Sequence, residues 1–220
     1  MADLITSSAE AAHGLYKKAS DLLRENPSLT NSVNDFLSEY KGGIAGITDL
    51  NLNTMGWGDL FNIWLLQLGE FEDVDGFPVL SFGENAKTTK ELQTQEGVSN
   101  FRETISKNIQ AGNLDSIKDS WTYGQKGFYD GIAEMNTATS FLGSYNMSAT
   151  IAENPDGTCT VTYVVTNTTG WASATRLRKD NDNDEIHDPI FEDTKRGESL
   201  IDLGGTIQQD WTWTEVFDKN

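Results

Sequence analysis

Apolar residues recur at helical spacing through the first part of the chain. They fall three and four positions apart over 11–23, and a second run of the same kind covers 29–40. Pro27 separates the two runs, because the residue before a proline is pushed out of the α region. The glycine pair at 42–43 is a favourable end for the second helix. The pattern therefore predicts a helical hairpin or arm over residues 1–50.

The helical pattern continues through residues 51–138. After Gly56, the stretch WGDLFNIWLLQLGE is apolar on nearly all sides, which is typical of a buried helix. A short extended run, FPVLSF, follows an acidic turn. Thr88 and Glu91 then form a capping-box pattern before another helix. Apolar residues between positions 92 and 109 lie on one face of that helix, with Gly97 as an expected break or kink.

The period changes to strict alternation near Phe141, which is typical of half-buried strands. Two alternating runs, 145–151 and 159–165, flank the sequence NPDG. This is a turn sequence, since Pro fixes φ and Gly accepts a positive φ. Further strands are expected at 171–177 and 207–213. Residues 139–220 are therefore predicted to form an antiparallel sheet.

These elements predict an α+β fold, in which a helical N-terminal half packs on a C-terminal antiparallel sheet of about four strands. The expected domains are a helical arm at 1–50 and an α+β domain at 51–220. Within that domain, residues 51–138 are expected to be helical and residues 139–220 to be antiparallel β structure.

The charge balance excludes several classes of partner. The chain of 220 residues carries 34 acidic residues against 16 Lys plus Arg, a formal net charge of −18. Phosphate contacts need clustered basic residues, so nucleic acid is not an expected partner. Anionic membrane surfaces are disfavoured for the same reason. Cys159 is the single cysteine, so no disulfide forms within the chain, and we expect it to be a small core residue on a strand.

No targeting or spanning segment is recognisable. The N-terminal residues lack the charged and apolar regions of a signal peptide. The most apolar stretch, 60–68, is far shorter than the roughly 20 residues that span a bilayer. We therefore expect a soluble chain without a transmembrane segment, which another protein carries if it is exported.

A polar segment between the last two expected strands, RLRKDNDNDEIHDPIFEDTKRGESL, is predicted to be an exposed loop, and long loops often carry function. Its acidic residues match part of a calcium-binding loop, at Asp180, Asp182, Asp184 and Asp188. The match fails afterwards, because Glu185 replaces the required glycine and Phe191 the bidentate glutamate. A weak Ca²⁺ site and a plain solvated loop both remain open, and no other cofactor is indicated.

The same loop holds the candidate catalytic residues. His187 is flanked by Glu185 and Asp188, and a neighbouring carboxylate would raise its pKa and orient its ring. Arg176 and Arg178 precede it in the loop. A dyad of Cys159 with His187 is conceivable, although Cys159 alternates with the core residues of its strand. The chain lacks the HExxH, GxSxG, P-loop and GxGxxG motifs, so no reaction class is assigned and both a catalytic and a non-catalytic role stay open.

Tryptophans in the expected sheet offer a different chemistry. Trp171, Trp211 and Trp213 would stack on sugar rings if they faced outward. Their spacing next to polar threonines also fits the buried face of a sheet. Exposure of Trp211 or Trp213 therefore distinguishes a carbohydrate-binding surface from an ordinary core.

Several phrases, taken in order, resemble a C-terminal domain that follows RHS repeats in bacterial polymorphic-toxin-like secreted proteins. They are IWLLQLGE, SFGENAKTT with QEGVSNFR, TSFLGSYNMS, VTNTTGWASATRLR, and RGESL followed by GGTIQQDWTW. The resemblance covers roughly residues 56–217. It implies a module of a large secretion-linked protein, delivered to another cell or to the surface. It also implies a carrier or delivery protein and a cognate immunity protein as partners, and it brings no catalytic residues with it.

The leading hypothesis is therefore a toxin or effector domain. The alternatives are a non-catalytic binding module, with a calcium-assisted carbohydrate or protein ligand, and a structural domain of a large secreted protein.

Overall fold

The computed structural model describes residues 22–45, 51–67, 72–74, 77–122, 141–170 and 204–219. Contacts divide the chain into two compact units. The first consists of Met1–Asp49, Phe61–Pro78 and Thr169–Ile207, and the second of Leu50–Leu60, Val79–Thr168 and Gln208–Asn220. Among the described residues, no helix combines the length and the apolar character needed to cross a membrane.

The first unit contains helix α2 (Pro27–Ala45), the short strand β1 (Glu72–Val74) and most of helix α3 (Trp57–Leu66). The second predicted helix is present as α2, but it runs through the glycine pair at 42–43 to Ala45. The C-terminal turn of α3 is bound to the segment before the last strand. Trp64 Nε1 donates to the Gly205 carbonyl at 2.6 Å, and the Gly204 N–H donates to the Leu65 carbonyl at 2.6 Å.

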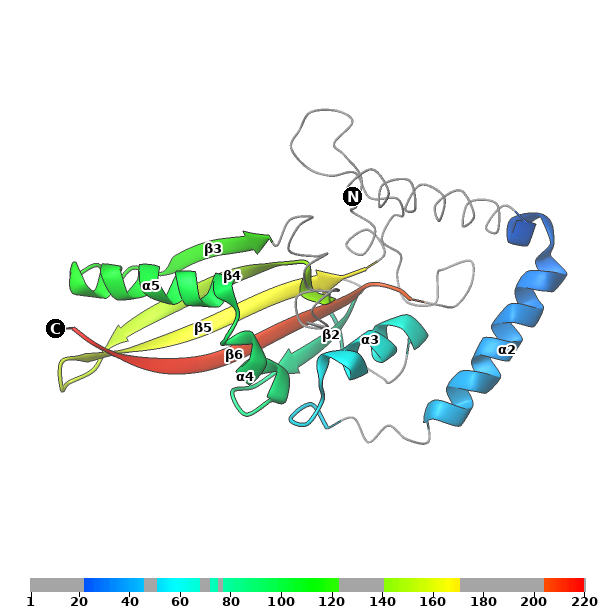
Figure 1. The fold of residues 1–220 in the computed structure, drawn as a ribbon, viewed down its shortest axis with the longest axis horizontal. Helices are drawn as coiled ribbons and strands as arrows, with labels where there is room; N and C mark the ends of the chain where they lie inside the picture. Colours follow the sequence, from blue (N-terminus) through cyan, green and yellow to red (C-terminus); the bar gives the residue numbers. More distant parts are fainter. Residues whose placement is uncertain are drawn as a thin grey trace, which may run out of the picture. The chain divides into compact units, whose positions relative to one another are not determined.

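The described strands form one sheet in the order β1-β2-β6-β5-β4-β3. Figure 1 labels the five strands that follow β1 in this order. They are β2 (Phe77–Phe82), β3 (Ile117–Thr122), β4 (Ser144–Glu153), β5 (Thr158–Thr169) and β6 (Ile207–Asp218). The predicted hairpin is confirmed as β4 and β5, with Ala149 opposite Tyr163 and Ile151 opposite Val161.

Two features of the predicted sheet were wrong. The sheet has more strands than the four expected, because β2 and β3 both join it and the short β1 pairs with β2 at the edge. The sheet is also mixed, since β2 runs parallel to β6, with Leu80 opposite Gln209. The strand expected at 171–177 lies outside the described residues.

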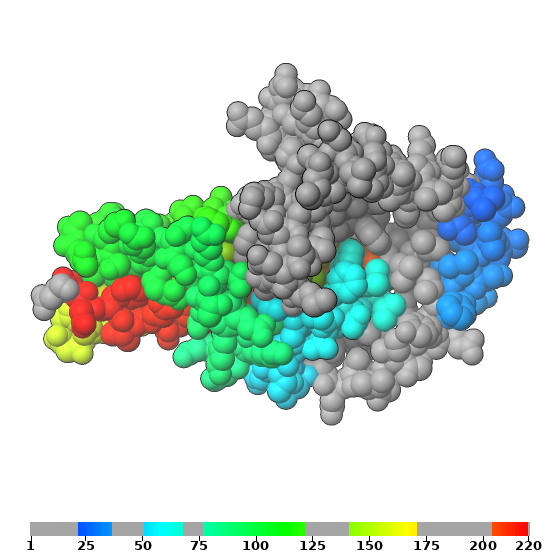
Figure 2. Space-filling view, viewed as in Figure 1, coloured from blue at the N-terminus to red at the C-terminus, as the bar shows by residue number. Residues whose placement is uncertain are grey.

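Helices α4 (Lys87–Leu92) and α5 (Glu96–Gln110) lie on the same side of the sheet (Figure 1). Figure 2 shows both helices in green on this side, with β6 in red reaching the surface beside them. The predicted apolar face of α5 is confirmed, and its members Val98, Phe101, Ile105 and Ile109 are buried.

Gly97 causes no break in α5, contrary to expectation. It lies in the first turn of a continuous helix, where a Cβ would sit 2.5 Å from the Tyr145 hydroxyl and closer still to the Trp121 ring. Glycine therefore serves close packing of the helix on β3 and β4 rather than flexibility. The capping box is also wrong, because Thr88 lies inside α4 and is buried, and Ala86 is the N-cap.

One face of the sheet forms the core. Alternate positions of the three long strands are buried, and the intervening positions are partly or fully exposed. The buried side chains include Tyr145, Met147, Cys159, Val161, Tyr163, Val165, Trp211 and Trp213. Trp211 and Trp213 are 0% and 1% exposed, so they pack in the core and cannot stack on a ligand. Cys159 is buried as predicted.

Candidate functional site

The residues singled out from the sequence are Arg176, Arg178, Asp180, Asp182, Asp184, His187 and Asp188. All of them lie outside the described residues, so their mutual geometry stays a prediction. The chain topology nevertheless fixes where their segment is attached. Residues 171–203 leave the sheet after β5 and re-enter it at β6.

The ends of four strands meet at that same end of the sheet (Figure 1). The last residue of β3, Thr122, is opposite the first residue of β4, Ser144. Asn146 near the start of β4 is opposite Thr166 near the end of β5. The side chains of Asn167 and Gln209 then join β5 to the start of β6. Segments 123–140 and 171–203 are therefore both connected at one end of the sheet, which we call the loop end.

Buried polar groups mark the loop end. Asn167 Nδ2 donates to Gln209 Oε1 at 3.0 Å, and both side chains are buried. Further along β6, Trp211 Nε1 donates to the buried Thr88 hydroxyl of α4 at 3.2 Å. Buried polar atoms need such partners, because an unpaired one costs about 1–3 kcal/mol. These bonds fix the register of β6 against β5 and the position of α4 over the sheet.

An aromatic cluster adjoins these polar groups. The Trp211 ring stacks on Phe82, with ring centroids 5.4 Å apart, and is tilted against Trp57 at 5.6 Å. Trp57 also contacts Phe141, which lies three residues before the start of β4, with ring centroids 6.2 Å apart. The Trp57 Nε1 atom is buried and has no hydrogen-bond partner among the described residues. These ring contacts hold the start of α3 against the loop end by aromatic packing rather than by a hydrogen bond.

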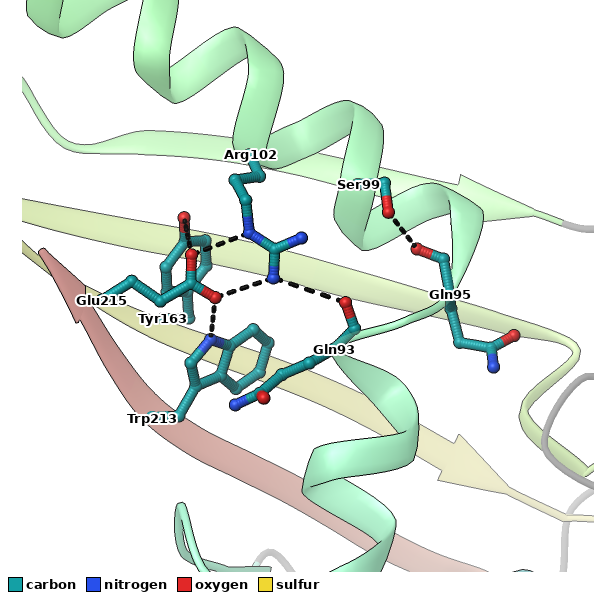
Figure 3. A network of polar contacts seen from close by, with 7 residues as sticks. All are labelled: Gln93, Gln95, Ser99, Arg102, Tyr163, Trp213 and Glu215. Carbon is teal, nitrogen blue, oxygen red and sulfur yellow. Dashed lines mark hydrogen bonds and ion pairs between the residues drawn. The ribbon is translucent and has the colours of Figure 1, made fainter. Parts of the chain in front are cut away.

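The most elaborate polar network lies between α5 and the sheet (Figure 3). Arg102 donates two hydrogen bonds of 2.7 Å to the Glu215 carboxylate, from Nε to Oε2 and from Nη2 to Oε1. The same Nη2 donates to the Gln93 carbonyl at 3.3 Å. Tyr163 donates its hydroxyl to Oε2 at 3.3 Å, and Trp213 donates Nε1 to Oε1 at 3.0 Å. The carboxylate thus receives four hydrogen bonds from three elements.

These contacts change the acidity of the groups involved. Burial disfavours the charge of Glu215, but hydrogen bonds from Arg102, Trp213 and Tyr163 outweigh it and lower the Glu215 pKa. The hydrogen bond to Glu215 raises the Arg102 pKa. Burial, followed by the charge of Glu215, raises the Tyr163 pKa. All three groups therefore keep their ordinary charge state at neutral pH.

The geometry makes this network a structural clamp. A general base needs a lone pair free to accept a substrate proton, whereas both oxygens of Glu215 already accept two hydrogen bonds each. The clamp joins α5 to β5 and β6 by a bidentate Arg–carboxylate pair, a specific and strong geometry. Sequence reasoning missed it, although one signal was present. The alternation that buries Trp211 and Trp213 continues to Glu215, and a carboxylate on a buried face requires a partner.

Metal ligands do not gather in the described part of the chain. No group of three or more His, Cys, Asp or Glu side chains that could hold a metal ion occurs there.

Comparison with known proteins identifies no relative. No family model, no curated protein and no solved structure matches the chain.

Proposed function

We propose that the chain is a toxin or effector domain delivered by a bacterial secretion-linked protein of the RHS type. The observation that carries the proposal is the position of the segments that resemble such domains. FLGSYNMS enters β4, VTNTTGW includes the end of β5, and GGTIQQDWTW forms the start of β6. The first two segments belong to one hairpin and the third follows more than 30 residues later, and their register brings all three together at the loop end.

The loop end also supports a location for the chemistry. The opposite end of the β4–β5 hairpin is closed by the tight turn at 154–157, where the Gly157 N–H donates to the Asn154 carbonyl at 3.0 Å. At the loop end, the chain instead leaves β5 and enters the segment that holds His187, Asp188, Arg176 and Arg178 before it returns as β6. Functional residues are often found on loops positioned by a rigid scaffold. We assign the activity to this segment, with a Ca²⁺ ion at Asp180, Asp182, Asp184 and Asp188 as its candidate cofactor.

The proposal carries the partners that the resemblance implies. A carrier or delivery protein exports the domain, which needs no signal peptide of its own, and a cognate immunity protein protects the producing cell. The reaction and the target remain unassigned within this proposal. The alternatives are a non-catalytic module that binds a carbohydrate or protein ligand with the help of calcium, and a structural domain of a large secreted protein. Both predict that expression of the chain does not harm the cell.

Induced expression in a bacterium tests the proposal. The full chain is kept in the cytoplasm in one strain and exported to the periplasm in another. We expect growth arrest in one compartment, and restored growth for H187A/D188A at equal protein level. The matched control, Asp35→Ala at an exposed position on α2, should remain toxic. Normal growth in both compartments, with folded and abundant protein, would refute the toxin proposal. Toxicity that survives alanine substitution throughout 176–193 would refute the assignment to this segment.

A further inference from the structure

The face of the sheet opposite α4 and α5 is covered with hydroxyl groups. It is formed by the positions that alternate with the core, and we call it the threonine face. Its hydroxyl residues with described side chains are Ser81, Ser120, Ser144, Ser148, Thr150, Thr158, Thr160, Thr162, Thr166, Thr168, Thr212 and Thr214. Hydroxyl residues on neighbouring strands also lie side by side; for example, Thr150 on β4 is opposite Thr162 on β5.

Most of these hydroxyls are not used by the fold. The hydroxyls of Thr158 and Thr160 both accept from Asn154 Nδ2, and Ser81 donates to Asp210 at 2.7 Å. Ser148 donates to the Val164 carbonyl at 3.5 Å. Thr150, Thr162 and the threonines at 166, 168, 212 and 214 form no side-chain hydrogen bond to any described residue. Five of these six are exposed and Thr162 is half-buried, so their hydroxyls are available to a ligand.

The threonine face is nearly free of charge, although the chain carries a net charge of −18. The charged residues at its positions are Lys118 on β3, Asp210 on β6 and Asp218 at the end of β6. β-propensity favours threonine on strands and disfavours Asp, Glu and Lys to a smaller degree, so it accounts for only part of the lack of charge on an exposed face of a strongly acidic protein. The charge distribution therefore favours a neutral ligand over a cationic or an anionic one.

The side-chain chemistry narrows the class of ligand. Each threonine presents a hydroxyl group beside a methyl group. Neighbouring threonines on this face are about 4.8 Å apart from one strand to the next and about 7 Å apart along a strand. Sugar rings likewise offer hydroxyls beside C–H surfaces, and a polysaccharide repeats them along its length. A protein partner is disfavoured, because protein interfaces depend on buried aromatic and arginine anchors. The threonine face has none among its described positions on β3 to β6, and Phe77 on β2 is its one aromatic residue.

We propose that the threonine face binds a neutral polysaccharide chain. This site is separate from the proposed activity at residues 171–203 and does not depend on it. It differs from the sugar-stacking surface considered from the sequence, since Trp211 and Trp213 are in the core. Such binding would hold the domain at a polysaccharide-coated surface.

Affinity electrophoresis of the full chain tests the proposal. Native gels contain glycol chitin, hydroxyethyl cellulose or dextran as neutral probes, and alginate as an anionic probe. We expect at least one neutral polymer to retard the protein. The variant T150V/T162V/T166V/T212V removes hydroxyls but keeps the β-branched shape, and its Kd should rise at least tenfold. The control variant T94V/T104V, altered at exposed threonines outside the sheet, should bind like the wild type.

Urea unfolding followed by tryptophan fluorescence checks that each variant folds. Should the quadruple variant fail this check, Thr212→Glu at an exposed position is the decisive variant, because one negative charge on the threonine face should abolish retardation. No retardation by any neutral polymer, equal retardation of variant and wild type, or retardation by alginate alone would each overturn the proposal. Retardation without growth arrest would leave it standing and overturn only the proposed function.

Discussion

Replacing Glu215 by glutamine removes the charge at the centre of the clamp and changes little of its volume. The amide keeps one acceptor oxygen, but its NH₂ group then faces donors of Arg102 or Trp213. The bidentate pair is lost, and donors on α5, β5 and β6 must compete for the remaining oxygen. The variant therefore measures what the clamp contributes to folding.

The size of the effect follows from the partial burial of the pair. The Arg102 and Glu215 side chains are 32% and 23% exposed. An exposed ion pair contributes about 0–1 kcal/mol, whereas breaking a buried one costs about 3–5 kcal/mol. The intermediate exposure and the two additional donors predict a loss of about 2–3 kcal/mol in the free energy of unfolding at pH 7.

The effect should depend on pH in one direction. The pKa of Glu215 is lowered in the folded state, so its stabilising contribution is present above the unfolded pKa, about 4.3. That contribution is lost as the pH falls through the lower folded pKa. The difference between wild type and Glu215→Gln should therefore be full at pH 7 and should shrink below about pH 4.

Urea denaturation at pH 7 and pH 3.5 measures both effects, with tryptophan fluorescence as the signal. A double-mutant cycle with Arg102→Met isolates the pair itself. Glu103→Gln is the matched control, because Glu103 bonds Lys107 at 2.7 Å on the same helix but both side chains are largely exposed. It should change stability little. A coupling energy near zero, or an equal loss at both pH values, would refute the role assigned to the clamp.

Further predictions follow from the packing and from the acidic loop. Gly97→Ala should lower the free energy of unfolding by about 1–3 kcal/mol, because the new methyl collides with Trp121 and Tyr145; Gly58→Ala, where a Cβ meets no atom within 4 Å, should not lower the urea midpoint. Thr88→Val removes the acceptor of Trp211 Nε1 and should cost about 1–3 kcal/mol in the same assay; an unchanged midpoint would contradict the bond. The buried Cys159 thiol should react with Ellman's reagent only on unfolding, so stoichiometric labelling of native protein would contradict its burial. If the acidic loop binds Ca²⁺, the ion should raise the Tm of the wild type, and D182N/D184N should remove the increase.

Local patterns predicted the elements whose partners are close in sequence. The β4–β5 hairpin was predictable because alternation fixes the buried face and a four-residue turn fixes the pairing. The buried face of α5 was predictable from its helical period. Both signals lie within about 20 residues, so the sequence specifies them without knowledge of the rest of the chain.

Long-range pairings gave no such signal. Ser81 and Asp210 are in register although 129 residues separate them, and no local pattern identifies β2 as the partner of β6. β3 was missed because its alternation places Asp119 on the core side, which is tolerated at an edge of the sheet. The clamp was missed for a related reason, since Arg102 and Glu215 look like ordinary surface residues until α5 is docked on β6.

The alternation that builds the core also leaves the threonine face free to serve binding. A slip of one residue would exchange the two faces of a strand, so the register must be specified by the buried side. Here that side carries specific polar contacts, Asn167 with Gln209 and Arg102 with Glu215, in addition to its aromatic packing. Folding therefore requires of the opposite face only residues that suit a strand. Threonine meets that requirement better than lysine or glutamate, and it gives the exposed side the hydroxyl-rich, nearly uncharged surface that the proposed neutral ligand would need.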